Sequence, residues 1–284
     1  METIRIDDPS DPRLGDYHLL NDQRARRTYE GDEFFIAEGY VPIDRVVDSD
    51  HHIRSILLTP SRVDRFAERL ERIHHLRADE FEAPVFVVER DVIAAVVGFD
   101  LHRGVVASVD RRPLHSLDEV IAGPARRIAV LEGLNDAENV GVIARAARAL
   151  GIDALVLDPT CTDPYARRTI RVSMGEVLHL PTARATDWPA DLARLHDGGF
   201  ETWSMTPAPD AVDLWAAPVP DRLAIVLGAE GPGLDDTTLR ATTHRVRIPI
   251  DPAVDSLNVG HAAAITFAAT GRPSASPQPG QKRS

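Results

Sequence analysis

LAIVLGAEGPGLDD, residues 223–236, is the stretch that decides the fold. An apolar run, typical of a buried strand, leads directly into Gly228, Gly231 and Gly233. Glycine lets the backbone turn sharply and approach a ligand closely, because it has no Cβ. Such a turn at the carboxyl end of a strand predicts a ligand site on an α/β sheet. Glu230 lies inside the turn, where its carboxylate either accepts backbone hydrogen bonds and orients a substrate or simply faces solvent.

The spacing of these glycines argues against two nucleotide-binding classes. No Lys-Ser or Lys-Thr pair follows them, which excludes a P-loop. They also lack the spacing of the dinucleotide fingerprint, which disfavours a nicotinamide-dependent oxidoreductase.

Elements of alternating type surround this stretch. Strand-like runs are RIAVLEGL (127–134), DALVLDP (153–159), FETWSMT (200–206), RLAIVLG (222–228) and HRVRIPI (244–250). Helical patterns fall near residues 140–150, 192–197, 236–241 and 257–270. This alternation predicts a mostly parallel sheet that is covered by helices on both faces.

The earlier part of the chain predicts a separate α/β domain. Its strand-like runs are FFIAEG (34–39), IRSILLTP (53–60), APVFVVER (83–90) and GVVASVDR (104–111), and its helical patterns are 41–49 and 61–73. Ser61 is the expected N-cap of the second helix, and Phe66, Leu70 and Ile73 fall on one face of it. A chain of 284 residues is long enough for two such domains.

Composition limits the class of protein and its compartment. Apolar residues make up 43% and charged residues 27%, as in ordinary globular domains. No apolar stretch is long enough to cross a bilayer, and one cysteine cannot form an internal disulfide. We therefore expect a cytoplasmic protein that has no membrane partner.

The net charge of −12 argues against nucleic acid unless a local basic face exists. Arginines gather in four clusters that could provide such a face, or could be solvated helix faces balanced by nearby acids. The clusters are Arg24, Arg26 and Arg27; Arg111 and Arg112; Arg126 and Arg127; and Arg167, Arg168 and Arg171.

Two further segments flank the glycine turn in sequence and are each ambiguous alone. In NDAENVGVIARAARALG (135–151), Asn139 is the expected cap of a helix whose apolar stripe leaves Arg145 on another face. In RIPIDPAVDSLNVGHAAAITFAATG (247–271), Ser256 or Asn258 opens a helix of small residues. The structural alternative is that both segments are simply capped helices.

Together the three segments resemble the three motifs of the SpoU branch of the SPOUT superfamily, in order and at appropriate separations. The resemblance covers roughly residues 126–271, and RVSMGEVLHLP (171–181) is similar to the family's connecting segment. The matching positions are Asn139, Gly141 and Arg145; Gly228, Glu230, Gly231 and Gly233; and Pro249, Ser256, Leu257 and Asn258. The early domain is similar, more loosely, to the L30e-like domain of rRNA-modifying members.

The resemblance implies an α/β architecture in two parts. A SPOUT methyltransferase domain at 126–271, with a parallel sheet flanked by helices and a deep trefoil knot, follows an L30e-like RNA-binding domain at 28–110. An N-terminal arm (1–27), a proline-containing linker (111–125) and a disordered tail (272–284) complete the expected boundaries.

The resemblance also implies a homodimer that transfers a methyl group from S-adenosylmethionine to a ribose 2′-OH of RNA. The cofactor-binding set is Leu227, Gly228, Glu230, Gly231, Gly233, Ile248, Pro249, Ser256, Leu257 and Asn258. The catalytic set is Asn139, Arg145, Glu230, Ser256 and Asn258. Arg145 is either the base that takes the hydroxyl proton or a clamp on the adjacent phosphate, and in the dimer it can act on the partner's site. A guanidinium accepts a proton only after losing one, which makes the base role physically awkward, whereas the clamp needs no deprotonation. The sequence does not choose between the two roles.

Departures and alternatives remain. Gly260 and His261 stand where the family often has a small hydroxyl residue, so His261 could lie near the site. The pairs His51, His52 and His74, His75 match no zinc spacing, and we expect no metal. The separate early domain favours rRNA over tRNA as the substrate. Another possibility is a catalytically silent relative that only binds RNA. The sequence also does not separate a housekeeping enzyme from an antibiotic-resistance enzyme.

Overall fold

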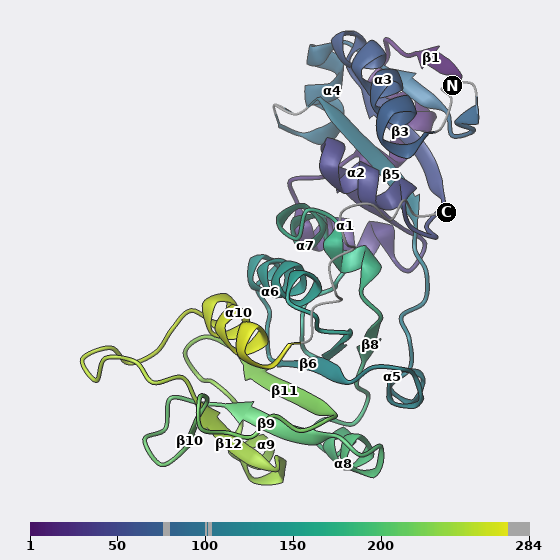
Figure 1. The fold of residues 1–284 in the computed structure, drawn as a ribbon. Coiled ribbons are helices and arrows are strands. Elements are labelled where there is room, and N and C mark those ends of the chain that lie inside the picture. Colours follow the sequence, from purple (N-terminus) through teal and green to yellow (C-terminus); the bar gives the residue numbers. More distant parts are fainter. Residues whose placement is uncertain (76–79, 100, 102–103, 272–284) are drawn as a thin grey trace. The chain divides into compact units, whose positions relative to one another are not determined.

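The computed structural model describes residues 1–75, 80–99, 101 and 104–271, with only the backbone at 23–24 (Figure 1). The expected disordered tail, 272–284, lies outside the described residues. The chain divides into two compact units. The first holds Met1–Pro113 and Asp163–His179, and the second holds Leu114–Thr162 and the chain from Leu180 onward.

The first unit is built on a mixed five-stranded sheet in the order β1-β4-β3-β5-β2. β1, β4 and β3 run parallel, whereas β5 is antiparallel to both β3 and β2. Its strands are β1 (Thr3–Arg5), β2 (Phe34–Glu38), β3 (Ile53–Leu58), β4 (Val85–Val87) and β5 (Val105–Asp110). Its helices are η1 (Pro12–Tyr17), α1 (Gln23–Glu30), α2 (Tyr40–Val47), η2 (Pro60–Arg62), α3 (Val63–His74), α4 (Arg90–Val97), α7 (Arg167–Val172) and η4 (Glu176–His179).

The first 27 residues differ from the expected arm. β1 pairs with β4, and Leu14, Tyr17 and Leu20 are buried in the core of the unit. Tyr17 also exchanges a hydrogen bond of 2.6 Å with Ser55 on β3. Buried apolar and aromatic side chains of this kind tie a terminus to its domain.

The start of α3 also differs from the prediction. Ser61 lies inside the short 3-10 helix η2, and Arg62 occupies the N-cap position without a side-chain cap. Phe66 and Leu70 are buried as expected, whereas Ile73 near the end of the helix is 40% exposed.

The segment 163–179, which the sequence assigned to the second domain, belongs to the first unit. Tyr165 stacks on Phe35 of β2 at 5.0 Å between ring centroids, and Arg111 donates two hydrogen bonds to Asp163, of 3.1 and 2.6 Å. Aromatic stacking and a buried bidentate ion pair therefore fix this segment to the sheet of the first unit.

The second unit is built on a seven-stranded sheet in the order β10-β12-β9-β11-β6-β7-β8. Every pair in it is parallel, as the alternating pattern predicts. Its strands are β6 (Arg127–Glu132), β7 (Ala154–Leu157), β8 (Thr182–Arg184), β9 (Glu201–Met205), β10 (Val212–Asp213), β11 (Leu223–Gly228) and β12 (His244–Arg247). Its helices are α5 (Leu117–Ala122), α6 (Ala137–Ala149), α8 (Asp191–Asp197), α9 (Asp236–Ala241) and α10 (Val259–Thr270).

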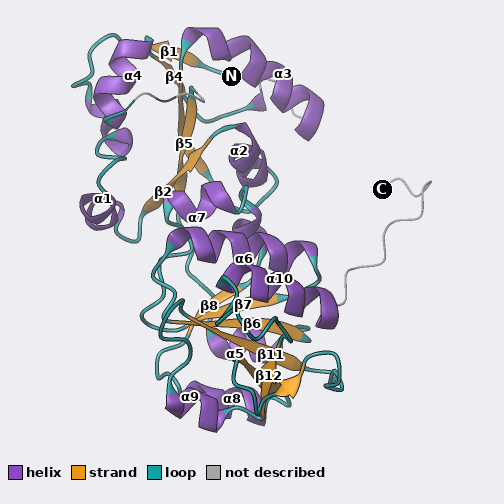
Figure 2. Cartoon of the chain, turned by 90° about the vertical axis from the view of Figure 1, so that its left-hand side faces the viewer, coloured by secondary structure: helices purple, strands orange, loops and turns teal. Residues whose placement is uncertain are grey.

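Helices cover both faces of this sheet (Figure 2). On one face, α5, α8 and α9 pack over Ile128, Val130 and Val226 in one continuous apolar cluster. On the other face, α10 packs against α6 and β11. The nearly continuous apolar runs of β6, β7 and β11 are explained by burial on both sides.

Helix boundaries in the second unit correct two expectations. The N-cap of α6 is Asp136, whose side chain accepts the Glu138 N–H at 2.8 Å, and not Asn139. The expected linker 111–125 contains α5, which starts with a capping box between Ser116 and Glu119 and buries Leu117 in the core. Prolines and a Gly-Pro pair thus flank a short helix of the second unit.

Candidate functional site

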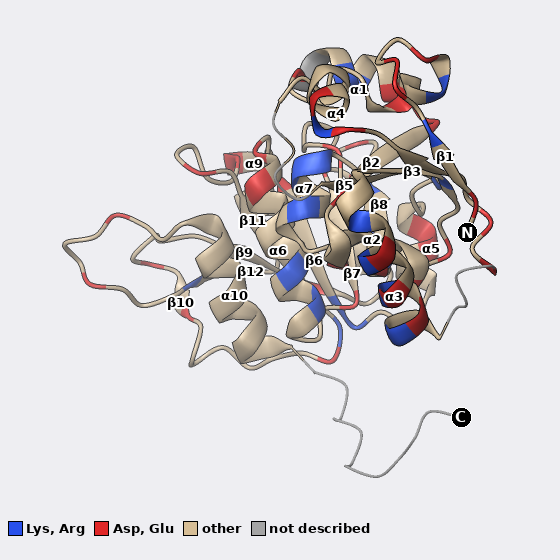
Figure 3. Ribbon diagram, turned by 90° about the horizontal axis from the view of Figure 1, so that it is seen from above, with Lys and Arg blue, Asp and Glu red and all other residues tan. Residues whose placement is uncertain are grey.

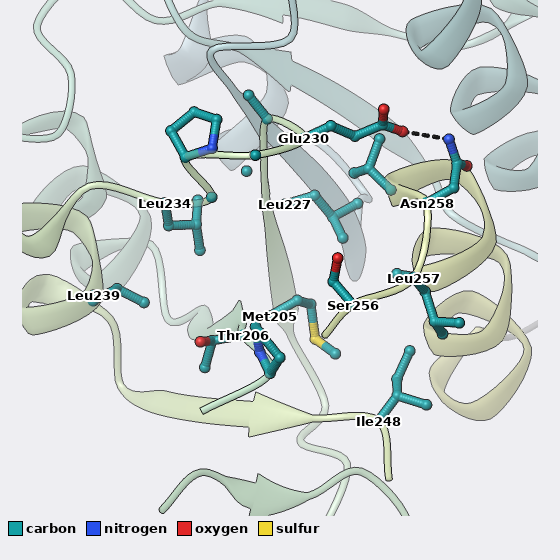
Figure 4. A pocket seen from close by; sticks show the side chains of 18 of the residues that line it. Met205, Thr206, Leu227, Glu230, Leu234, Leu239, Ile248, Ser256, Leu257 and Asn258 are labelled. Carbon is teal, nitrogen blue, oxygen red and sulfur yellow. Dashed lines mark hydrogen bonds between the residues drawn. The ribbon is translucent and has the colours of Figure 1, made fainter. Parts of the chain in front are cut away.

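A cavity of about 690 Å³ opens at the carboxyl ends of β9 and β11 in the second unit (Figure 4). This volume lies within the usual range of small-molecule sites. The turn after β11, the loop after β12 and the first turn of α10 supply most of its wall. The lining residues are Met205, Thr206, Pro207, Leu227, Gly228, Ala229, Glu230, Gly231, Pro232, Gly233, Leu234, Asp236, Leu239, Ile248, Ile250, Ser256, Leu257, Asn258, Val259 and Ala262.

The glycine turn after β11 folds back on itself. Gly233 donates its N–H to the Ala229 carbonyl at 3.0 Å, and a Cβ on Gly228 would lie 2.4 Å from the Gly233 carbonyl carbon. Gly231 and Gly233 have φ values of +88° and +74°, in the left-handed region that favours glycine. The sequence-predicted turn is therefore real, and larger residues at these positions would open it.

Glu230 and Asn258 meet at the edge of this cavity. The Asn258 Nδ2 group donates to the Glu230 carboxylate (Figure 4). It also donates to Asn139 Oδ1 on α6, at 3.3 Å. The other amide atom, Oδ1, caps α10 by accepting the Gly260 N–H at 2.9 Å and the His261 N–H at 3.3 Å. One amide thus joins the three sequence segments and fixes the start of a helix.

Arg145 lies apart from this cluster. It is exposed on α6 and does not line the cavity. Within the described parts of the chain, neither a hydrogen bond nor an ion pair is assigned to its guanidinium. A catalytic role for Arg145 would therefore require a site other than the cavity of its own chain.

The remaining predicted cofactor residues mostly reach the cavity. Leu227, Ser256 and Leu257 line it, and Ile248 lines it together with Ile250. Pro249 is exposed between these two isoleucines and does not line it. His261 is exposed, one residue before the lining residue Ala262. Whether these residues hold a cofactor stays a prediction.

Sequence reasoning missed the contribution of β9. Met205 ends this strand, Thr206 and Pro207 follow it, and all three line the cavity. A signal was present, because ligands in parallel sheets bind beyond the carboxyl ends of adjacent strands. The order of the strands, which the sequence does not reveal, was needed to use it.

Three arginines of these clusters lie in the interior of their units and so add nothing to a basic face. Arg26 and Arg127 are buried, and Arg111 is nearly so. Arg26 pairs with Glu30 at 2.8 Å, and Arg127 donates to the Thr270 carbonyl at 2.7 Å. These arginines bind partners inside their own units, so their charges are not available to contact RNA phosphates.

Neither a metal site nor a membrane span emerges from the described ranges. They contain no group of three or more His, Cys, Asp or Glu side chains that could hold a metal ion. Among the same residues, no helix combines the length and apolar character that a bilayer crossing requires.

Residues 126–268 match the model of the SpoU rRNA Methylase family. The chain belongs to this family. The match includes the first two segments and residues 247–268 of the third. It confirms the resemblance found in the sequence.

Known proteins of this kind are similar over almost the whole chain. An uncharacterized tRNA/rRNA methyltransferase of Mycobacterium tuberculosis, Rv0881, is 42% identical over 92% of this chain and 88% of its own length. The 23S rRNA (guanosine(2553)-2′-O)-methyltransferase RlmP of Bacillus subtilis is 25% identical over 92% and 96%.

A solved structure shows the same fold. The crystal structure of an AdoMet-bound rRNA methyltransferase from Sinorhizobium meliloti is similar with a TM-score of 0.75, at 23% identity over 94% of this chain and 97% of that chain. The predicted α/β fold with a parallel sheet flanked by helices is confirmed.

Proposed function

We propose that this SpoU family member transfers a methyl group from S-adenosylmethionine to a ribose 2′-OH of RNA, with rRNA as the substrate class. The observation that carries the proposal is the hydrogen-bonded cluster of Asn139, Glu230 and Asn258, which brings the three family segments to one cavity. The relatives' names support the substrate, since one acts on a 23S rRNA 2′-O position.

The cavity suits the proposed cofactor. Leucine, isoleucine and methionine side chains offer an apolar wall for an adenine ring, whereas Glu230, Ser256 and Asn258 offer polar groups for hydroxyl, amine and carboxylate. The glycine turn gives backbone access without a Cβ in the way. When bound, S-adenosylmethionine supplies an activated methyl group.

The protein's own residues then position the ribose. We assign Glu230 and Asn258 to orienting the polar groups at the cavity edge, because each fixes the other. For Arg145 we propose the phosphate clamp. Its guanidinium is exposed and offers a fixed fork of N–H donors, so bidentate contact with an RNA phosphate would align the 2′-oxygen and needs no proton transfer to the arginine.

A homodimer would bring Arg145 to a second cavity. α10 carries no Asp, Glu, Lys or Arg among its twelve residues (Figure 3). His261 and Ala268 on this helix are exposed. The neighbouring α6 exposes Val142. A helix without charged residues that is partly exposed is typical of a homodimer interface, and we propose that Arg145 on the neighbouring α6 reaches the partner's site.

The family also supports finer features of the architecture. We propose that the first unit is an L30e-like domain that binds RNA and that the second is the catalytic SPOUT domain. A trefoil knot in the second is supported by the path from β12, at one side of β9, back to α10 against α6. We also propose that the protein acts in the cytoplasm, which a role in rRNA modification would support.

The test is transfer of labelled methyl from S-adenosylmethionine to undermodified total RNA, fractionated into rRNA and tRNA and digested to nucleosides. We expect label in a 2′-O-methyl nucleoside of rRNA. Label in tRNA would show that the substrate is tRNA and not rRNA. Cofactor binding without transfer to either RNA would favour a silent relative, and absence of both would overturn the proposal.

A further inference from the structure

Glu132 is a buried carboxylate that lies beside the cavity but does not line it. It ends β6, is 6% exposed and is the partner of Gly228 in the β6–β11 ladder. Removing a carboxylate from water is costly unless hydrogen bonds replace the water. The contacts of this side chain are therefore informative.

Three donors converge on Glu132. The Asp235 N–H donates to Oε1 at 2.7 Å, while Trp188 Nε1 and Thr238 Oγ1 each donate to Oε2 at 2.5 Å. A carboxylate is the side chain that accepts from all three without presenting a donor of its own. An amide or an apolar group at this position would leave at least one donor without an acceptor.

Two of these donors belong to the start of α9. Asp235 is its N-cap and Thr238 its N3 residue, yet Asp235 makes no side-chain cap. In a capping box the N3 side chain accepts the N-cap N–H. Here Glu132, from a strand more than a hundred residues earlier, accepts that N–H and binds the N3 hydroxyl. The start of α9 is thus fixed from β6.

The same contacts fix the far end of the glycine turn. The turn leaves β11 at Gly228 and is closed near its origin by the Gly233 to Ala229 hydrogen bond. Its other end is Asp235, which Glu132 holds. Glu230 lies between the two anchors, and Asp236 and Leu239 of α9 add to the cavity wall.

We propose that Glu132 is a positioning residue for the cofactor pocket. It acts through Asp235 and Thr238 on the turn that carries Glu230, and this role rests on the proposed function because it assumes that the cavity takes S-adenosylmethionine. Trp188 adds a third anchor from the loop before α8.

The test compares Glu132→Gln with wild type by calorimetric binding of S-adenosylmethionine and by thermal unfolding without ligand. Glutamine keeps the volume but turns an N–H toward a donor. We expect the Kd for S-adenosylmethionine to rise about tenfold, equivalent to about 1.4 kcal/mol. Thr238→Val removes a single donor, keeps the carboxylate and should weaken binding in the same direction by a smaller factor.

The control is Asp153→Asn. Asp153 Oδ2 accepts the Arg126 and Arg127 N–H groups, both at 2.8 Å, at the opposite end of β6. It should lower the unfolding temperature and leave the Kd unchanged. If Glu132→Gln and Thr238→Val lowered only the unfolding temperature, Glu132 would be a stability residue and the proposal would be wrong. If the wild-type protein did not bind S-adenosylmethionine, the proposed function would be wrong, and the role of Glu132 in cofactor binding would be wrong for that reason.

Discussion

Asn258 and Asn139, which are 119 positions apart in the sequence, are joined by a hydrogen bond of 3.3 Å from Nδ2 to Oδ1. The same Nδ2 group binds Glu230, and the same side chain caps α10 through Oδ1. Asn258 therefore combines a structural role at the helix start with a connecting role at the cavity edge. The two roles use different atoms, so substitutions can separate them.

Asn258→Ala should lose both roles, whereas Asn258→Ser should lose only the connection. Serine still offers a capping oxygen, but it cannot reach Asn139 and Glu230 at once. For alanine we expect a loss of about 1 kcal/mol in unfolding free energy. Serine should unfold close to wild type, and both variants should lose most methyl transfer. A serine variant with full transfer would show that the connection is unimportant.

Arg145→Ala should abolish most methyl transfer without lowering stability. The side chain is exposed, so we expect the unfolding free energy to change by no more than about 0.5 kcal/mol. Arg145→Lys should also be impaired, because an ammonium cannot make the bidentate contact of a guanidinium. Arg148→Ala, on the same helix and also exposed, is the matched control and should stay active.

Mixed dimers of Arg145→Ala and Glu230→Ala test whether the site is shared between subunits. If Arg145 acts on the partner's cavity, each mixed dimer holds one complete site, and activity returns. A two-fold dimer has two equivalent sites, and one of them is complete in the mixed dimer. Methyl transfer per mixed dimer should therefore recover to about half that of the wild-type dimer. No recovery, with mixed dimers verified by mass, would place Arg145 in its own subunit's site.

Long apolar strands and the helices next to them were predictable from the sequence. β11 and α9 fall where the pattern places them, because a strand buried on both faces needs a continuous apolar run. β8 and β10 were missed, since strands of two or three residues are defined by their neighbours. The start of α6 was misplaced because Asp136 and Asn139 are both good capping residues three positions apart.

The site was predictable only as separate segments. Family resemblance identified Glu230 and Asn258, but their contact depends on how two distant loops meet. Glu132 gave no sequence signal, because an acid at a strand end reads as a surface residue. Likewise, the assignment of 163–179 to the first unit depends on the partner of Arg111, which no local pattern reveals.

Arg111→Met should release the segment 163–179. Arg111 is buried between Asp163, at 2.6 Å, and Glu30, at 3.4 Å. Burial raises the pKa of the Asp163 carboxyl, but the hydrogen bonds and charge of Arg111 leave that pKa below its usual value. Removing the cation leaves Asp163 with the half-exposed Arg27, at 3.3 Å, as its cationic partner, while Glu30 keeps its bond to Arg26. We therefore expect a cost of about 3 kcal/mol, the low end for a broken buried pair. Hydrogen exchange across 163–179 should accelerate.

The adjacent Arg112→Ala is the control for that substitution. Arg112 is half exposed and pairs with the exposed Asp50 at 2.9 Å. Such pairs contribute about 0–1 kcal/mol. If Arg112→Ala accelerated exchange as much as Arg111→Met, general loss of positive charge, and not the buried pair, would explain the effect.

Cys161 should resist alkylation in the folded protein at pH 8. Burial, followed by the nearby charge of Asp158, raises the pKa of its thiol to about 12. Because the thiolate is the reactive form, folding suppresses the reaction. The stabilisation that goes with the neutral thiol is present below pH 9 and is lost as pH rises toward 12. Mass spectrometry after iodoacetamide treatment, with and without urea, measures this, and rapid alkylation without urea would contradict it.

Ala268→Glu should convert the proposed homodimer into a monomer. Ala268 is exposed on α10, which has no charge of its own, and a carboxylate buried there without a partner would oppose association. Ala193→Glu, at an exposed alanine of α8 in the same unit, is the control and should stay dimeric. Sedimentation velocity distinguishes the two states. If Ala268→Glu were a folded monomer that bound S-adenosylmethionine but transferred no methyl, the requirement for Arg145 of the second subunit would be supported; a dimeric Ala268→Glu would move the interface away from α10.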